Sequence, residues 1–387
     1  MSFKELIDIP GVKPVMFTLL MTAFGFGVIL PILPFYATSL GATPFELGML
    51  TSVFAFMSLL FGPIAGKMAD KYGRKKVLLA GTASFFIGYL IFAFTHSLQA
   101  AFLARAMEGV AAAAIFPACI SLLSDFTTEQ QRGKAMGLVA MSFSLGFIIG
   151  PAFGGLAAAI SVQTAFLLSA LFAALNFASV LLQVREPVEK AESKDLAQKE
   201  VSLLEHISSP VLFLFLSSAI TTFMIGGLDA VLALSTSERL GFTSAEVGIL
   251  FTYIGVLILT MQFVASHAIN RFGEKRLIPV GLALSGLGFF LLEFAGGWPM
   301  LMLALGVFVA GNAAVFPSVT SLITKKVTGK RGAVLGLNSS FQSAGQLLGP
   351  LYGGFLYGIN HQYAFPGLAI AIWIYALFFY FKASKKL

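Results

Sequence analysis

Long apolar segments recur along the whole chain, and short polar stretches separate them. A helix needs about 20 apolar residues to cross a bilayer. Twelve segments reach about that length: residues 14–37, 45–66, 77–96, 99–123, 135–159, 165–183, 209–235, 244–266, 277–296, 300–323, 333–358 and 364–381. This pattern predicts an all-α integral membrane protein with twelve transmembrane helices.

Residues 184–208 form the one long polar stretch of the chain. Its mixture of acidic and basic residues is typical of a solvated linker. We therefore expect an N-terminal six-helix bundle over residues 1–183, a linker over residues 184–208 and a C-terminal six-helix bundle over residues 209–387.

The two predicted bundles repeat one another in sequence. The pattern Leu-Gly-x-Thr-x-x-Glu-x-Gly begins at Leu40 and again at Leu240, 200 residues later, and a Phe-Pro pair recurs at Phe116 and Phe316. Six crossings return the chain to its starting side, so the two copies should have the same orientation. Parallel repeats of this kind are one of the known architectures of transporters.

Composition excludes most classes of soluble protein. Hydrophobic residues make up 57% of the chain, charged residues 11%, and the mean hydropathy is +0.88. A soluble enzyme, a nucleic-acid-binding protein or a secreted scaffold could not cover its surface with so few charges. The lone Cys119 excludes an intramolecular disulfide, and no His-x-x-x-His or Cys-x-x-Cys pattern is present. We expect no cofactor, no metal, no enzymatic activity and no nucleic-acid partner.

Basic residues indicate the topology. With the N-terminus in the cytoplasm, 23 of the 25 Lys and Arg residues fall on the cytoplasmic side. The exceptions are Arg239, in an outer loop, and Arg105, inside a span. Such a bias predicts that both termini are cytoplasmic. We expect a monomer in the cytoplasmic membrane of a bacterium.

Small residues lie along one face of the fifth span. Gly146, Gly150 and Gly154 would let this helix approach a neighbour at backbone contact. Pro151 should kink the helix. The alternative is a tightly packed seam with no part in coupling. The complete motif consists of Gly137, Gly146, Gly150, Pro151, Gly154 and Gly155.

The loop between the second and third spans is strongly basic. Asp70 lies among five cations and could accept hydrogen bonds from the N-terminus of a neighbouring helix, which would hold one conformation closed. The alternative is a charge cluster that only fixes topology. The second copy has Asn270 at this place, so we expect the latch in one half only. The predicted latch consists of Gly66, Asp70, Gly73, Arg74 and Arg132.

These motifs carry a family resemblance over essentially the whole length. Together with Gly25, Pro31 and Pro34 in the first span, and Arg105 with Gly109 in the fourth, they resemble the twelve-helix drug–proton antiporter family of the major facilitator superfamily. The resemblance implies proton-coupled export by alternating access, with helices 1, 4, 7 and 10 around a central cavity. Glu108 departs from the family pattern, which has an uncharged amide there.

Three carboxylates remain inside spans: Glu108, Asp229 and Glu293. Charges at membrane depth are expensive, so by default they indicate a substrate or ion pathway. Asp229 has no basic residue within one turn and is our first candidate for carrying the coupled proton; a structural ion pair with Arg105 is the alternative. Glu108 is the second, with Arg105 three residues away; a static ion pair is the alternative. We expect Glu293 to be interfacial and solvated.

Other polar residues in the spans predict where a substrate would bind. The expected cavity is lined by Asp229, Thr222, Asn312, Asn338 and Gln342. The first functional hypothesis is therefore proton-coupled efflux of small amphiphilic compounds through the lipid bilayer. A uniporter or proton symporter for a sugar or other metabolite is the alternative, although a sugar site needs more hydrogen-bonding side chains. A membrane receptor or membrane enzyme is a third possibility.

Overall fold

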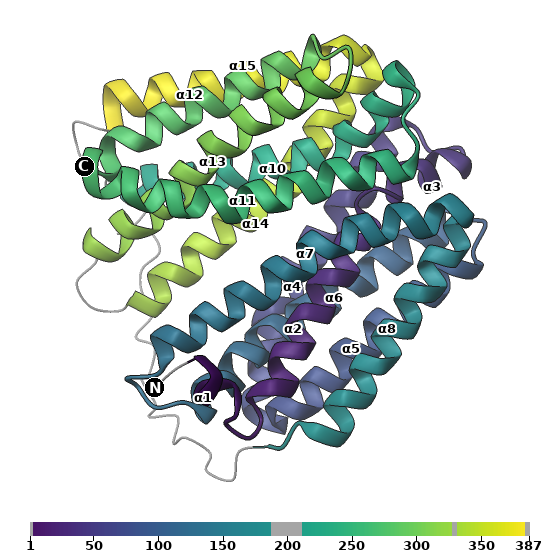
Figure 1. Cartoon of the computed structure of the whole chain (residues 1–387), viewed down its shortest axis with the longest axis vertical. Helices are drawn as coiled ribbons and strands as arrows, with labels where there is room; N and C mark the ends of the chain where they lie inside the picture. Colours follow the sequence, from purple (N-terminus) through teal and green to yellow (C-terminus); the bar gives the residue numbers. More distant parts are fainter. Residues whose placement is uncertain (1–2, 187–210, 327–330, 384–387) are drawn as a thin grey trace. The chain divides into compact units, whose positions relative to one another are not determined.

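The computed structural model describes residues 3–186, 211–326 and 331–383, so most of the predicted linker lies outside the described residues. Every regular element in these ranges is a helix. The first half contains α1 (Phe3–Ile7), α2 (Val12–Ile29), α3 (Leu33–Ser39), α4 (Pro44–Tyr72), α5 (Arg74–Phe94), α6 (Leu98–Phe126), α7 (Arg132–Ile160) and α8 (Val162–Gln183). The second contains α10 (Val211–Leu240), α11 (Ser244–Phe272), α12 (Glu274–Glu293), α13 (Trp298–Lys326), α14 (Arg331–Ile359) and α15 (Ala364–Phe378) (Figure 1). Two short elements, η1 (His361–Tyr363) and η2 (Phe379–Ala383), flank α15.

Each predicted span coincides with described helices. Eleven helices in the described ranges are long and apolar enough to cross a membrane. The predicted span 333–358 corresponds to α14, which is not one of the eleven. This helix has 29 residues and carries Asn338, Gln342 and Gln346 among its apolar positions, which lower its hydropathy.

The first predicted span is not one helix, and this part of the prediction was wrong. The chain breaks between α2 and α3 at residues 30–32. Pro31 has no N–H to donate, and its ring clashes with the carbonyl four residues earlier. Pro34 then stands in the first turn of α3, where a missing N–H costs nothing.

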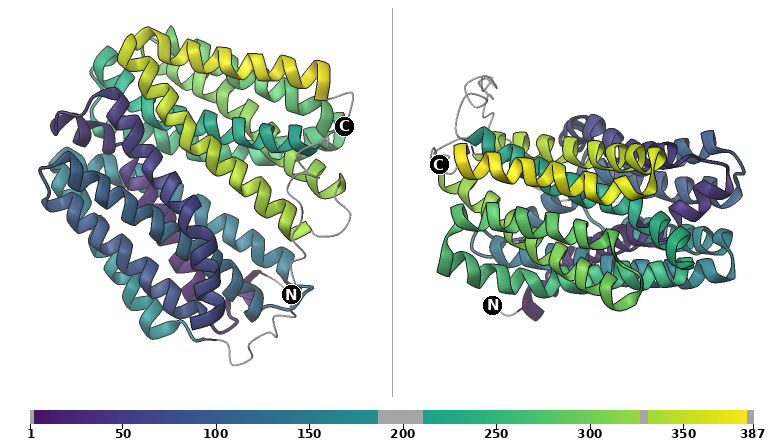
Figure 2. Two further views of the ribbon diagram at one scale, coloured as in Figure 1. Left: turned by 180° about the vertical axis from the view of Figure 1, so that it is seen from behind. Right: turned by 90° about the horizontal axis from the view of Figure 1, so that it is seen from above.

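The described residues form two compact units. Among the described residues, unit 1 comprises 3–41, 53–186 and 243–252, and unit 2 comprises 42–52, 211–242, 253–326 and 331–383. In unit 1, α2 packs on α6, α7 and α8, and α5 packs on α6 and α8. In unit 2, the repeat-related helices pair similarly: α10 packs on α13, α14 and α15, and α12 packs on α13 and α15 (Figure 2). The sequence repeat is therefore also a repeat of helix packing.

The repeated Leu-Gly-x-Thr motif has a local structural cause. Thr43 donates its backbone N–H to Oε2 of Glu46 at 2.8 Å, and the Glu46 N–H returns to the Thr43 hydroxyl at 3.2 Å. Thr243 donates likewise to Glu246 at 2.8 Å. At Thr43 the two bonds form a capping box, which starts α4, and at the start of α11 the bond from Thr243 to the glutamate is kept. The glycine before each box, Gly41 or Gly241, has a φ of +81° or +69°, a backbone conformation that favours glycine.

Candidate functional site

A charged pair lies in the middle of unit 1. Arg105 and Glu108 stand on α6 and are 1% and 0% exposed. Arg105 Nη1 donates to Glu108 Oε2 at 2.6 Å, as their spacing of three residues predicts. The guanidinium carbon lies 4.9 Å from the ring centre of Phe54 and 6.0 Å from that of Phe26. Two aromatic faces therefore assist one carboxylate in stabilising the buried cation.

The pair is not fully satisfied. Arg105 Nε and Glu108 Oε1 have no hydrogen-bond partner among the described residues, and the same holds for two buried neighbours, the hydroxyl of Tyr89 and Oδ1 of Asn176. Sequence reasoning found the pair but missed Tyr89 and Asn176. A tyrosine and an asparagine in apolar helices give no signal until packing shows that they share a core.

The glycines of α7 make the close contact that the sequence predicted, and the neighbour is α2. A Cβ placed on Gly150 would lie 2.5 Å from the carbonyl oxygen of Phe24, and one on Gly154 would meet the backbone of Val28. Gly146 likewise faces the Leu20 carbonyl. No side chain fits at these positions, so α7 and α2 touch through their backbones.

The remaining glycines of the motif are not equivalent to these. Gly155 faces the first turn of α11, inside unit 1, where a Cβ would lie 3.1 Å from the Cα of Gly248. Pro151 lies within α7 and packs its ring against Gly27 of α2. Gly137 lies inside α7, in the second turn from its start. The motif therefore serves two helix interfaces.

The predicted latch residues lie in the second half of α4, at the start of α5 and at the start of α7. Asp70 is exposed near the end of α4, and Gly66 has open space around its Cα. Gly73 has a φ of +98° and ends the helix. Arg74 forms an ion pair with Asp125 at the end of α6, while Glu186 accepts the backbone N–H groups of Arg74 and Lys75 at 2.7 and 2.8 Å. Arg132 begins α7 and is exposed.

The predicted substrate residues of unit 2 are partly engaged with one another. The Thr222 hydroxyl lies 2.6 Å from the backbone carbonyl of Gln342, so it connects α10 to α14. Asn312 donates from α13 to the Thr221 carbonyl at 3.4 Å. Asn338 is 4% exposed, and its Oδ1 has no partner among the described residues. Asp229 is half-buried on α10.

Glu293 is not the solvated interfacial carboxylate that the sequence suggested. Its side chain is only 14% exposed, and Oε2 lies 3.7 Å from Nη1 of Arg239. Arg239 stands in the last turn of α10 and also donates to the Glu293 carbonyl. Residues 54 positions apart make this pair, and sequence spacing cannot indicate it.

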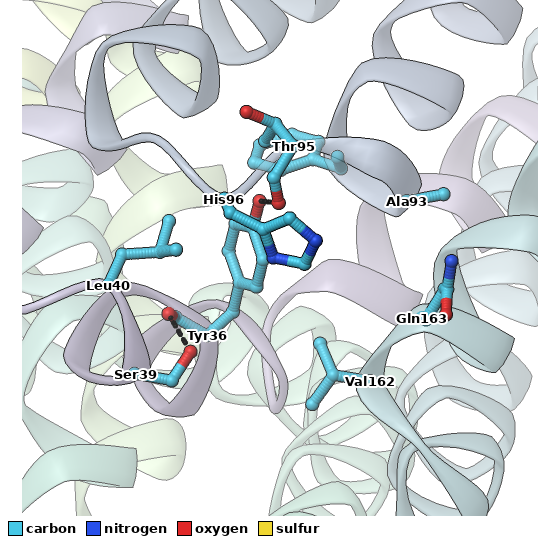
Figure 3. Close-up of a pocket in the computed structure, with 9 residues that line it drawn as sticks. Tyr36, Ser39, Leu40, Ala93, Thr95, His96, Val162 and Gln163 are labelled. Atoms are coloured by element: carbon cyan, nitrogen blue, oxygen red, sulfur yellow. Dashed lines mark hydrogen bonds between the residues drawn. The ribbon is translucent and has the colours of Figure 1, made fainter.

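A cavity of about 410 Å³ opens at one end of unit 1, where α3 and α5 end and α8 begins. The His96 ring points into it between Tyr36, Val162 and Gln163 (Figure 3). The Tyr36 hydroxyl donates to the Thr95 carbonyl at 3.2 Å, which fixes one wall. Sequence reasoning did not anticipate this cavity because its lining comes from three separate segments.

Comparison with known proteins identifies the family. The sequence model described as Major Facilitator Superfamily matches residues 15–237 and residues 214–387. The chain belongs to this superfamily. Multidrug resistance protein 1 of Bacillus subtilis is 30% identical, with 96% of this chain and 97% of the relative covered. The quinolone resistance protein NorA of Staphylococcus aureus is 27% identical, with 89% of each chain covered.

A solved structure shows the same fold. The crystal structure of a D-xylose–proton symporter superposes with a TM-score of 0.80 at 16% identity and covers all of both chains. The predicted all-α major facilitator fold and the predicted family are confirmed. The protein is a multi-pass membrane transporter, and its substrate is a small molecule.

Proposed function

We propose that this transporter exports small amphiphilic compounds in exchange for protons. The observation that carries the proposal is the similarity to Multidrug resistance protein 1 along nearly the whole chain. The α7 glycines add support, because the residues that resemble an antiporter motif make backbone contact with α2. The likeness to the sugar symporter supports only the shared fold, since identity is 16%.

Alternating access is the mechanism that this proposal implies. The two six-helix halves would rock about a central site, as parallel-repeat transporters do. The exposed Asp70, with Gly66, Gly73, Arg74 and Arg132, would form the contact that holds one state closed. Both termini would be cytoplasmic, and the protein would act as a monomer.

Coupling requires a carboxylate that alternates between protonated and ionised forms. We assign this role first to Asp229 and second to Glu108 with Arg105. An ionised Asp229 would attract a cationic substrate or leave space for a neutral one, and a protonated Asp229 would release it. Thr222, Asn312, Asn338 and Gln342 would provide polar atoms at the same site.

The test of the function is dye accumulation in inside-out vesicles with and without an imposed proton gradient. We expect accumulation of cationic dyes to stop when a protonophore collapses the gradient. Dye transport at the same rate with and without the gradient would contradict proton coupling. Gradient-dependent transport of sugars but not of dyes would favour the metabolite symporter.

The test of the carboxylate is proton release when substrate is added to the purified protein. Asp229→Asn should abolish both this release and proton-driven efflux, while binding of uncharged substrates persists in part. Asp229→Glu should retain part of the activity, and Glu108→Gln is the parallel variant. If Asp229→Asn releases as many protons as the wild type, the carrier is Glu108.

A further inference from the structure

Four buried polar atoms lack partners in one core. They are the Tyr89 hydroxyl on α5, Nε of Arg105 and Oε1 of Glu108 on α6, and Oδ1 of Asn176 on α8, all within unit 1 and counted among the described residues. The side chains that carry them are between 0% and 4% exposed. Buried polar groups are nearly always hydrogen-bonded, either to protein or to ordered water. Four unpaired groups in one core therefore indicate water.

A small cavity lies between two of these atoms. It measures about 10 Å³ and is lined by Tyr89 and Asn176 together with α2 residues around Gly25. This volume is about the minimum that one water molecule needs. The lining hydroxyls of Thr22, Thr82 and Ser169 each donate to a carbonyl of their own helix, at 2.7, 2.9 and 2.8 Å.

The cavity is therefore lined mainly by acceptors, with the Tyr89 hydroxyl and the amide N–H groups of Asn176 as donors. The three lining hydroxyls have already used their hydrogens, so they offer only oxygen lone pairs, as does Oδ1 of Asn176. Tyr89 can supply a hydrogen of its own. A water molecule adds two donors and matches this arrangement. A protonated water adds three hydrogen-bond donors and matches the lining acceptors better.

Tyr89 connects the cavity with the charged pair. Its hydroxyl lies against the Cα of Gly25, and a side chain at that position would displace it. The preceding residue, Gly88, packs on Cγ of Glu108, which a Cβ at Gly88 would approach to 3.4 Å. Tyr89 also interacts electrostatically with both Glu108 and Arg105.

We propose that buried water occupies this core, with one molecule in the cavity between Tyr89 and Asn176. Tyr89 and this water form a route inside unit 1 by which Glu108 exchanges its proton. The inference rests on the proposed function only in that proton coupling would give the route a use.

The step is a proton relay. The Oε1–H bond of Glu108 breaks, and its proton passes, directly or over a bridging water, to the Tyr89 oxygen. Tyr89 simultaneously releases its own hydroxyl proton to the cavity water, which becomes a protonated water. Tyr89 is neutral before and after the step, and Arg105 stabilises the carboxylate that remains. Among the described residues, the other neighbours of the pair that these contacts identify are not titratable: Phe26 of α2 and Phe54 of α4 lie over the Arg105 guanidinium, and Gly88 of α5 lies against Glu108.

The experiment measures the rate of hydrogen–deuterium exchange at the Glu108 carboxyl. The readout is difference infrared spectroscopy on the purified full-length protein. The protonated carboxyl band is assigned by its absence in Glu108→Gln. Tyr89→Phe should slow exchange about tenfold, the rate effect expected from losing one hydrogen-bonding group from the transition state. Asn176→Leu should slow it in the same direction, because the cavity water loses its acceptor.

Tyr375→Phe is the matched control. Its hydroxyl donates to the Phe213 carbonyl at 2.6 Å in unit 2, so its loss should leave the Glu108 band unchanged.

Unchanged exchange in Tyr89→Phe, or a carboxyl band absent from the wild type at every pH, would overturn the proposal. If Tyr89→Phe unfolds, Asn176→Leu decides the same question. The infrared result does not depend on whether drugs are exported, so failure of the proposed function would be seen separately.

Discussion

The two units pack alike but fill their cores differently. Gly81 meets the carbonyl of Ala111 in unit 1 just as Gly281, 200 residues later, meets that of Gly311 in unit 2. At the same offset, Tyr89, Arg105 and Glu108 correspond to Phe289, Leu305 and Phe308. The rings of Phe289 and Phe308 contact edge to face with their centres 5.0 Å apart.

The fold therefore does not need charge at these positions. An apolar cluster is sufficient in unit 2, and buried ion pairs are often no more stable than well-packed apolar residues. Under the proposed function, the charged core of unit 1 serves proton transport rather than stability.

The ends of the units differ in another way. Arg74 pairs with Asp125 in unit 1, and the residues 200 positions later, Glu274 and Lys325, form the corresponding pair in unit 2 with the signs exchanged. Both units keep an ion pair between the start of one helix and the end of the next, α5 with α6 and α12 with α13. The positive side chain lies on the first helix in unit 1 and on the second helix in unit 2.

The largest expected effect is on the charged core. Arg105→Leu should leave Glu108 buried without its cation and lower the free energy of unfolding by about 3–5 kcal/mol. The double variant Arg105→Leu with Glu108→Phe reproduces the residues of unit 2 and should recover folded protein. Thermal unfolding in detergent measures both. A double variant as unstable as the single one would show that unit 1 cannot accept an apolar core.

Next in size is the glycine seam. Gly150→Leu in α7 and Gly349→Leu in α14 should both force helices apart, since a Cβ would meet the Phe24 or the Phe223 carbonyl. Overpacking of this kind costs about 1–3 kcal/mol or more. Gly62→Leu is the control because its Cα has open space around it. Efflux and the yield of folded protein are measured together. A stable Gly150→Leu variant with normal efflux would show that the contact between α7 and α2 has no role in transport.

The ion pairs at the ends of the units should have a smaller effect. Arg74→Glu places two carboxylates together at a site where both side chains are 16–21% exposed, and we expect a loss of about 1 kcal/mol. Adding Asp125→Lys restores a pair with the polarity of unit 2 and should recover the stability. Chemical unfolding of the single and double variants gives the coupling energy, and a coupling of zero would mean that the pair is incidental.

The smallest effect on stability is expected for the latch. Asp70 is exposed, so Asp70→Asn should change the free energy of unfolding by no more than about 0.5 kcal/mol while slowing transport. Asn270→Ala at the corresponding place in unit 2 should affect transport much less. Initial rates of efflux at matched expression decide the matter: equal defects would mean that both loops act only as topological anchors.

Much of the molecule follows from local sequence. Runs of about 20 apolar residues identify the spans because an unpaired backbone cannot lie in lipid. The capping residues Thr43 and Glu46 start a helix through bonds between close neighbours. The same holds for the Arg105–Glu108 pair, whose spacing of three residues places both side chains on one helical face.

What remained undetermined were contacts between residues far apart in the chain. No sequence pattern shows that the Tyr89 hydroxyl lies against Gly25, that Asn176 faces the same cavity, or that Arg239 pairs with Glu293. An apolar helix can present any of its faces to a neighbour, and the packing of whole helices selects one. Sequence by itself determined which segments cross the membrane and which residues carry charge there; only the tertiary structure decided which of those polar groups meet, because packing and not spacing sets those distances.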